Sequence, residues 1–309
     1  MKTYAIIVTY NGSKWIEKCL TSLNNSSISL EIIIIDNFST DNTIDIIEKN
    51  FSNVILIKSE KNLGFAKANN IGIKYALEHG VDYVFLLNQD AWVENDTIEK
   101  LLNSFKQILD AGIVSPIHLN GNKMGLDCGF VNYIANYNTA NFISDLYCNC
   151  LVDCYETKFV NAAAWLISRK CIEKVGGFDT SVFFHYGEDD DYCNRVIYHG
   201  FKIIINTKTT ICHDRDERNG KRPKEFELQK YNTVYKIKFS NILISDEQII
   251  KEYKYKYKIN FLHLMSLILR LKFKRFLTQR KLYKNETIMF KKIQKSRNIN
   301  KNEGLNWLD

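Results

Sequence analysis

Apolar runs alternate with helical repeats along the first third of the chain. Four continuously apolar runs predict strands that are buried on both faces: Tyr4–Thr9, Glu31–Ile35, Val54–Ile57 and Tyr83–Leu87. Apolar residues at helical spacing lie between them, as in Phe65–Leu77. Strands buried on both faces that alternate with helices are typical of parallel sheets with crossover helices. The pattern predicts an α/β fold with a mostly parallel sheet flanked by helices.

The second half of the chain has a less regular pattern. Phe159–Ile167 and Lys202–Ile205 predict strands, and Asp189–His199 predicts a helix. After about Lys224 the pattern becomes helical and increasingly basic. We therefore expect an α/β domain over residues 1–223, with halves at 1–115 and 116–223, followed by a basic amphipathic helical region over residues 224–309.

Composition narrows the class of protein. Of 309 residues, 45% are apolar and 25% are charged, which excludes a disordered chain and a disulfide-dense mini-scaffold. No secretory signal follows Met1, so we expect a cytoplasmic protein whose eight cysteines are reduced. The apolar stretch Ile259–Leu271 is interrupted by His263 and Arg270 and is shorter than the ~20 residues that a membrane span needs.

Positive charge is concentrated near the C-terminus. Residues 251–301 carry 16 Lys and Arg but two acids, whereas residues 1–250 carry 26 Lys and Arg against 31 acids. Aromatic and leucine side chains are interleaved with these lysines, which favours a helical segment lying on an anionic membrane surface. The alternative is a helical hairpin that packs its apolar face on the α/β domain with its lysines solvated. No recognised nucleic-acid-binding module is present, so we expect no nucleic acid partner.

Polar residues follow each of the four predicted strands. Because the carboxyl ends of parallel strands share one edge of a sheet, these residues should lie together where ligands bind. Asn, Asp and Gly are the usual residues of turns and helix caps, so any one of these turns is ordinary by itself. Four in succession favour a site for a base and a ribose. No Gly-rich phosphate-loop signature is present. The candidate residues are Thr9, Tyr10, Asn11, Asp36, Asn37, Asn62, Gly64, Lys67, Asn69, Asn88, Gln89 and Asp90.

Four consecutive acids, Glu188 to Asp191, precede a predicted helix. The helix dipole favours one or two acids at this position, but four repel one another unless they are protonated, paired or near a cation. A carboxylate in this segment could serve as a general base. His213 follows a predicted strand and could complete a site for Mg²⁺ or Mn²⁺ with Asp90, because carboxylate and imidazole groups are suitable ligands.

Six segments together resemble the family-2 glycosyltransferases of the GT-A fold, over roughly residues 3–215. The segments, in chain order, are VTYNG, IIIIDNFSTDNT, NLGFAKANNIGI, LLNQDA, GGFDTSVFFHYGEDDDYCNR and the histidine of ICHD. The LNQDA form resembles the bacterial rhamnosyltransferase-like subgroup. The resemblance implies an inverting enzyme that moves a sugar from a nucleoside diphosphate, such as dTDP-rhamnose or a UDP-hexose, to a hydroxyl of a growing cell-surface glycan. A lipid-linked acceptor would place the enzyme on the inner face of the cytoplasmic membrane.

The resemblance also implies roles for residues of the first half, which becomes the nucleotide-binding half. Thr9 and Tyr10 match the loop that packs on the base, and Asp36 matches the acid near the base. Asn37 stands where many members carry a second acid. Asn88 matches the first acid of the D-x-D motif and is here an amide, so we expect it to contact the ribose or a phosphate-bound water.

The catalytic roles fall on the acceptor half, residues 116–223, together with Asp90. Asp189 matches the catalytic base, and Glu188 and Asp191 would orient this base or the acceptor. Asp90 and His213 match the residues that contact the metal, Mg²⁺ or Mn²⁺.

Two other function classes remain open at this point. A sugar-nucleotide-binding scaffold without catalysis agrees with amides at positions 37 and 88, but the retained Asp90, Asp189 and His213 argue against it. A nucleotidyltransferase would use a similar sheet, but the first loop lacks the Gly-rich, basic sequence that grips a triphosphate.

Overall fold

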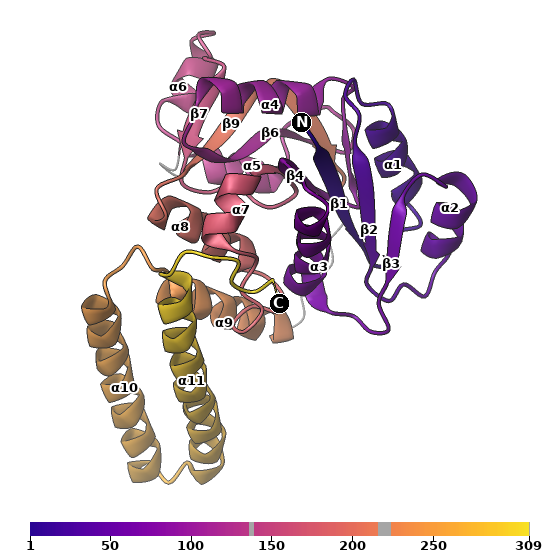
Figure 1. Ribbon diagram of the computed structural model, residues 1–309. Coiled ribbons are helices and arrows are strands. Elements are labelled where there is room, and N and C mark those ends of the chain that lie inside the picture. Colours follow the sequence, from indigo (N-terminus) through magenta and orange to yellow (C-terminus); the bar gives the residue numbers. More distant parts are fainter. Residues whose placement is uncertain (136–138, 216–223, 309) are drawn as a thin grey trace.

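A computed structural model describes residues 1–135, 139–215 and 224–308, with the backbone alone over 224–231. Within these residues a nine-stranded sheet forms the body of the molecule, with helices on both of its faces (Figure 1). The structure has the predicted α/β class and a GT-A-like arrangement. Two helices of the C-terminal region project away from the body (Figure 1).

The N-terminal half of the sheet is parallel, in the order β3-β2-β1-β4. Its strands are β1 (Thr3–Thr9), β2 (Glu31–Asp36), β3 (Ile55–Lys58) and β4 (Tyr83–Asn88). The crossover helices are α1 (Ile16–Asn24), α2 (Thr43–Asn50) and α3 (Gly64–Glu78). The expectation of parallel strands is confirmed for this half.

The second half of the sheet is mixed, which corrects the expectation of a mostly parallel sheet. β8 (Ala164–Ser168) is antiparallel to both β4 and β6 (Ala111–Asn120), and β6 is parallel to β9 (Lys202–His213). The edge strands β5 (Ala91–Val93) and β7 (Cys154–Thr157) are both antiparallel to β9.

Two predicted strands of this half had wrong bounds. The strand predicted over Phe159–Ile167 begins only at Ala164, because the preceding residues lead past a cavity instead of joining the sheet. The strand predicted over Lys202–Ile205 continues to His213 as β9. Pairing with β6 resumes at Thr210 after an irregularity in the register, and a local pattern does not reveal such a distant partner.

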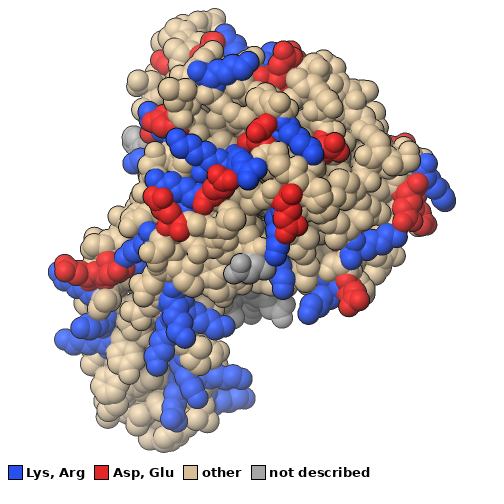
Figure 2. All heavy atoms as spheres, viewed as in Figure 1, with Lys and Arg blue, Asp and Glu red and all other residues tan. Residues whose placement is uncertain are grey.

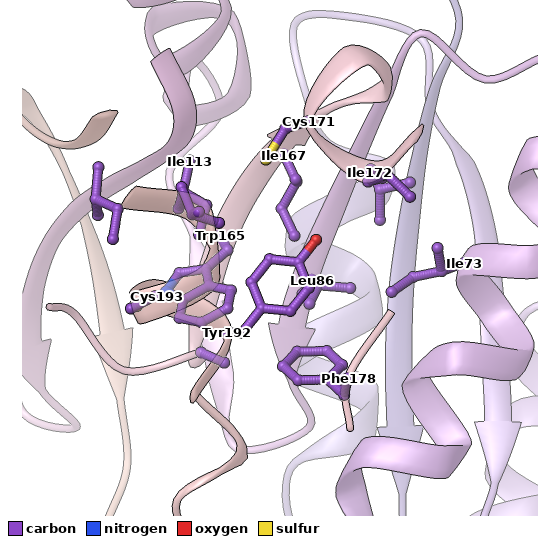
Figure 3. Close-up of a cluster of buried hydrophobic side chains, with 14 of the residues drawn as sticks. Ile73, Leu86, Ile113, Trp165, Ile167, Cys171, Ile172, Phe178, Tyr192 and Cys193 are labelled. Carbon is purple, nitrogen blue, oxygen red and sulfur yellow. The ribbon is translucent and has the colours of Figure 1, made fainter. Parts of the chain in front are cut away.

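Both faces of the sheet are buried, which explains the continuous apolar runs. Side chains alternate across a strand, so Ile33 and Ile35 of β2 join the core on the α3 side, whereas Ile32 and Ile34 join the core under α1. On the α3 side, Trp165, Phe178 and Tyr192 form a ring cluster (Figure 3). The remaining helices of the body are α4 (Thr97–Gln107), α5 (Cys128–Tyr133), α6 (Phe142–Tyr147), α7 (Arg169–Val175) and α8 (Glu188–Tyr198).

The C-terminal region contains α9 (Lys224–Ser240), α10 (Asp246–Leu269) and α11 (Phe273–Asn300). The base of the α10–α11 hairpin joins the body through a small core in which Phe290 and Ile293 pack with Phe183. The chain then returns to the body. Leu308 is buried in the core on the α3 side of the sheet, and the backbone N–H of Gly177 donates to Asn306 O at 2.8 Å.

The end of the chain is therefore part of the packing of the α/β body. Asn70 Nδ2 donates to Trp307 O at 2.9 Å, and Asp179 accepts a hydrogen bond from the Ser296 hydroxyl of α11. The domain boundary predicted at residue 223 lies outside the described residues and stays a prediction. The last residues of the C-terminal region nevertheless pack on the α/β body.

Candidate functional site

A cavity of about 330 Å³ lies where β4 ends and α8 begins. Five of the predicted site residues line it: Asn88, Asp90, Glu188, Asp189 and His213. They come from three segments that are far apart in the sequence. The structure thus brings the D-x-D-like segment, the acidic cluster and the histidine to one place, as expected from the sequence.

Strand pairing explains why Asp90 and His213 are neighbours. β5 begins directly after Asp90, and its first residue, Ala91, pairs with His213 at the end of β9. The Asp214 N–H donates to Asp90 O at 2.8 Å and closes this pair of strands. His213 Nε2 consequently lies 3.4 Å from Asp90 Oδ1 and 3.4 Å from Asn88 Nδ2.

The other ring nitrogen of His213 faces a buried carboxylate. His213 Nδ1 lies 3.6 Å from Asp127 Oδ2 and 3.2 Å from Arg215 Nε, and His213 and Asp127 are each 2% exposed. Asp127 Oδ1 also accepts from the Phe130 N–H at 2.9 Å, which caps α5. The Arg215 Nε–H thus donates to Nδ1, while the Asp127 carboxylate lies just beyond hydrogen-bond distance of it. Binding of a metal through Nε2 would require the proton on Nδ1, with Asp127 as its acceptor.

These groups fit a divalent metal in their chemistry and arrangement. A carboxylate oxygen and an imidazole nitrogen lie side by side in the cavity, and the imidazole is anchored on its far side. Across the described residues, no three His, Cys, Asp or Glu side chains are grouped so that they could hold a metal by themselves. A metal at Asp90 and His213 would therefore need its other ligands from water or from a bound ligand, which is usual for Mg²⁺.

Asp127 and Arg215 also belong to this site, although neither was among the predicted site residues. Asp127 is distant in sequence from every motif and carries only the weak signal of a helix cap. Arg215 Nε lies 3.3 Å from Asp127 Oδ2, and Arg215 also lines the cavity. The only sequence feature that pointed to Arg215 was its position two residues after His213.

The carboxylates at the start of α8 have raised pKa values. Burial, together with the charge of Asp189, raises the pKa of Glu188 to about 8. Burial and the same charge raise the pKa of Asp190 to about 7. Burial also raises the pKa of Asp189, against the opposing effects of backbone N–H groups and Arg215. Carboxylates that titrate near neutral pH are suited to act as general bases.

Asp191 does not line the cavity, which corrects its predicted role of orienting the base or the acceptor. Asp191 is 1% exposed and lies against Arg195, with Nε to Oδ2 at 2.8 Å. The Arg195 guanidinium also donates to Val175 O and Gly177 O. This part of the acidic cluster therefore forms a buried structural ion pair that ties α8 to the Gly177 turn.

The predicted base-binding residues lie at the ends of β1 and β2. Thr9 Oγ1 donates to Asp36 Oδ1 at 3.0 Å, and Asp36 Oδ2 accepts from the Ser39 N–H at 3.1 Å. Tyr10 is 47% exposed at this edge. The Gln89 amide holds the Tyr10 backbone from both sides, accepting from its N–H at 2.9 Å and donating to its carbonyl at 3.1 Å. Gln89 therefore positions Tyr10.

The turn before α3 is organised by an amide at position 37. Asn37 Oδ1 accepts from the Leu63 N–H at 2.6 Å, while its Nδ2 donates to Asn62 Oδ1 at 3.1 Å. A carboxylate could not donate to Asn62, so an amide suits this position better than an acid. Gly64 has φ +77°, and a Cβ there would lie 2.5 Å from Phe184 O.

Three further candidates lie in different surroundings. Asn11 (φ 49°) accepts from the Thr40 N–H at 2.8 Å, which links the ends of β1 and β2. Lys67 is exposed on the first turn of α3. Asn69 is 2% exposed, and its Nδ2 donates to Phe65 O at 3.0 Å within the helix. Its predicted contact with the nucleotide is therefore corrected to a structural role.

Comparison with known sequences identifies a family and several relatives. Residues 4–128 match the family described as "Glycosyl transferase family 2". The dTDP-rhamnosyl transferase RfbF of Shigella flexneri is 27% identical over 214 residues, covering 68% of each chain. The chondroitin synthase of Escherichia coli is 26% identical over 256 residues, and this chain spans 33% of its length.

Solved structures share the fold at low sequence identity. Staphylococcus aureus TarS residues 1–349, in complex with UDP-GlcNAc, superposes with a TM-score of 0.55 at 18% identity, covering 80% of this chain and 68% of TarS. GalNAc-T7 with UDP, GalNAc and Mn²⁺ superposes with a TM-score of 0.59 at 13% identity, covering 84% of this chain and 51% of that one.

Proposed function

Because the chain is a family-2 glycosyltransferase, we propose that it transfers a sugar from a nucleoside diphosphate to an acceptor hydroxyl with inversion at the anomeric carbon. The observation that supports this reaction is one cavity that holds Asp90 and His213 together with Asp189. A carboxylate near the acceptor and a charge-stabilising site near the leaving group are what single displacement needs.

Each residue then has a distinct task. Asp189 accepts the proton of the acceptor hydroxyl, and its raised pKa makes it a stronger base than an exposed aspartate. Asp90 and His213 would hold Mg²⁺ or Mn²⁺, which stabilises the charge of the departing diphosphate when it is bound. Arg215 and Asp127 lie against the far side of the His213 ring and would limit its rotation. The acceptor attacks in one step, so no covalent intermediate on the protein is required.

The donor is proposed to be dTDP-rhamnose or a UDP-hexose. The name of RfbF supports the first, and the UDP-GlcNAc complex of TarS supports the second. The test is a panel of nucleotide sugars incubated with the full chain, Mn²⁺ and saccharide acceptors, with released nucleoside diphosphate as the readout. We expect one donor to give turnover. Binding without release would instead identify the non-catalytic scaffold, and released pyrophosphate would identify a nucleotidyltransferase.

We propose further that the acceptor is a lipid-linked glycan and that residues 251–301 contact an anionic membrane from the cytoplasmic side. Between Glu252 and Glu286 the chain has ten Lys and Arg and no acid. Figure 2 shows basic side chains gathered over the projecting hairpin, whereas both signs are mixed over the body. No helix within the described part of the chain is both long and apolar enough to cross a bilayer.

The tip of the hairpin combines this charge with exposed apolar side chains. Leu269 is 80% exposed, Leu271 is 75% exposed and Phe273 is 57% exposed, and Arg270, Lys272 and Lys274 lie between and beside them. Apolar side chains among cations are the combination that inserts into the interface of an anionic bilayer. A bilayer would cover the two leucines, whereas the body of the protein leaves them exposed.

Replacing both Leu269 and Leu271 by aspartate should weaken binding to phosphatidylglycerol-containing vesicles by tenfold or more, because burying one leucine is worth about 1.5–3 kcal/mol and the added charges repel anionic lipid. Vesicle sedimentation measures the effect. The matched control is Leu109→Asp on the body, where the leucine is 85% exposed. Equal binding to neutral phosphatidylcholine vesicles, or full binding of the double variant, would contradict a tip-mediated membrane contact.

A further inference from the structure

A second, larger hollow adjoins the cavity of the candidate site. This groove has a volume of about 830 Å³ and is open to the surface. It shares Tyr133, Tyr186 and Asp189 with the smaller cavity. Asp90 and His213 line only the smaller cavity. Asp189 therefore stands at the junction between a compartment with the candidate metal ligands and a compartment without them.

The groove has one wall from the C-terminal region. Thr233 and Ile237 of α9 line it, together with Asn241 after that helix, opposite residues of α5 and α8. Close packing fixes α9 against the start of α8: Gly187 has φ +94°, and a Cβ there would lie 2.9 Å from Ile237 Cγ1. The catalytic acids and α9 thus form one packed unit, although they belong to different predicted domains.

The lining of the groove indicates the chemistry of its occupant. The side-chain amides of Asn132, Asn194 and Asn241 can both donate to and accept from hydroxyl groups. The rings of Tyr133, Phe159 and Tyr186 provide apolar faces, and Tyr133 and Phe159 pack edge to face at 4.8 Å. A lining that contains both amides and aromatic rings suits a hydroxyl-rich ring with apolar C–H faces. A lipid chain would require a continuously apolar lining.

We propose that this groove binds the saccharide of the acceptor and that α9 of the C-terminal region supplies one of its walls. The proposal rests on the proposed function. The acceptor hydroxyl would reach Asp189 from the groove, while the donor sugar reaches it from the cavity. The hydroxyl oxygen forms the new bond to the anomeric carbon and gives its proton to Asp189. The bond from that carbon to the diphosphate breaks, and the diphosphate leaves with the electron pair.

Saccharide binding to the full-length chain tests the proposal directly. A panel of neutral p-nitrophenyl hexosides is titrated in the presence of Mn²⁺ and saturating UDP or dTDP, and ligand-observed NMR measures binding. Thr233→Trp places a large side chain in the groove, and Asn194→Leu removes an amide from the opposite wall. The matched control is Val234→Trp, the neighbouring position on α9, where the side chain is 58% exposed and does not line the groove.

We expect the dissociation constant of the best hexoside to rise tenfold or more in Thr233→Trp and in Asn194→Leu, and to change less than twofold in Val234→Trp. Binding of the nucleoside diphosphate should be unchanged in all three variants. Hexoside binding that is unaffected by both groove variants, or absent from the unmodified chain, would overturn the proposal. A chain that binds hexoside in the groove but no nucleoside diphosphate would refute the proposed function and leave the groove assignment standing.

Discussion

Replacing Asp189 by asparagine should reduce sugar transfer by about a thousandfold or more while nucleoside diphosphate binding persists. General-base catalysis contributes typically 10²–10⁴-fold, and an amide of the same size cannot accept the proton. Asp189 lines the cavity together with Asp90 and His213, and it also lines the adjoining groove. Initial rates of nucleoside diphosphate release and the thermal shift caused by UDP or dTDP measure the two quantities separately.

The control for this substitution is Asp45→Asn, which makes the same change at an exposed position of α2. It should leave both readouts unchanged. Transfer that survives in Asp189→Asn would place the base elsewhere, at Glu188 or Asp190, whose pKa values burial and neighbouring charge raise to about 8 and about 7. Loss of nucleoside diphosphate binding would instead show that Asp189 shapes the donor site.

The pH dependence of the unmodified enzyme should follow from the same carboxylates. Burial raises the pKa of Asp189, so a larger fraction of the base is protonated and inactive at mildly acidic pH. The transfer rate should therefore rise as the pH increases toward neutrality, and this rise should be absent from the residual activity of Asp189→Asn.

The N-terminal half of the fold could be predicted because its signals are local. β1 to β4 are short apolar runs, and each is separated from the next by turn residues or an amphipathic helix. The second half depends on partners that are distant in sequence. β9 continues through the polar stretch Asn206–Thr210, where Asn206 pairs with β6 and β7 and Thr210 pairs with β6 across an irregularity in the register. No local pattern gives the direction or the length of such pairings.

The candidate site shows the same division. Asn88, Asp90, Asp189 and His213 could be predicted because each lies at or next to the end of a strand or in the first turn of a helix. Asp191 was misplaced because the sequence gives the position of α8 but not its rotation about its axis, and this rotation turns Asp191 toward Arg195. Asp127 was missed because only the fold brings it to His213.

The structure shows packing on the body at the base of the C-terminal region, whereas membrane contact of its tip stays a proposal. Its base packs on the body through Phe290 and Ile293, while its tip projects with exposed leucines. Because Leu308 lies in the core and Trp307 O accepts from Asn70, deletion of residues 251–309 would remove part of the body along with the hairpin. Point substitutions at the tip are therefore the sharper test of membrane binding.

Replacing Asp90 by asparagine should abolish the strengthening of nucleoside diphosphate binding by Mn²⁺ and reduce transfer by about a hundredfold or more. The Asp90 carboxylate lies 3.4 Å from His213 Nε2, and the described residues provide no third His, Cys, Asp or Glu side chain for a metal site. Loss of one of two protein ligands, and of its charge, should thus leave too few groups to hold a divalent ion. The readout is the UDP- or dTDP-induced rise in melting temperature with and without Mn²⁺.

The control for this result is Asp153→Asn. Asp153 is an exposed acid that is paired with Lys208 and does not line the cavity. It should keep the full effect of Mn²⁺. If Asp90→Asn also keeps that effect, the ion is held elsewhere, and Asp90 contacts the donor by itself. If the unmodified chain binds nucleoside diphosphate equally well in EDTA, Arg215 becomes the nearest candidate to stabilise the leaving diphosphate, because its guanidinium lines the same cavity and keeps its charge at any physiological pH.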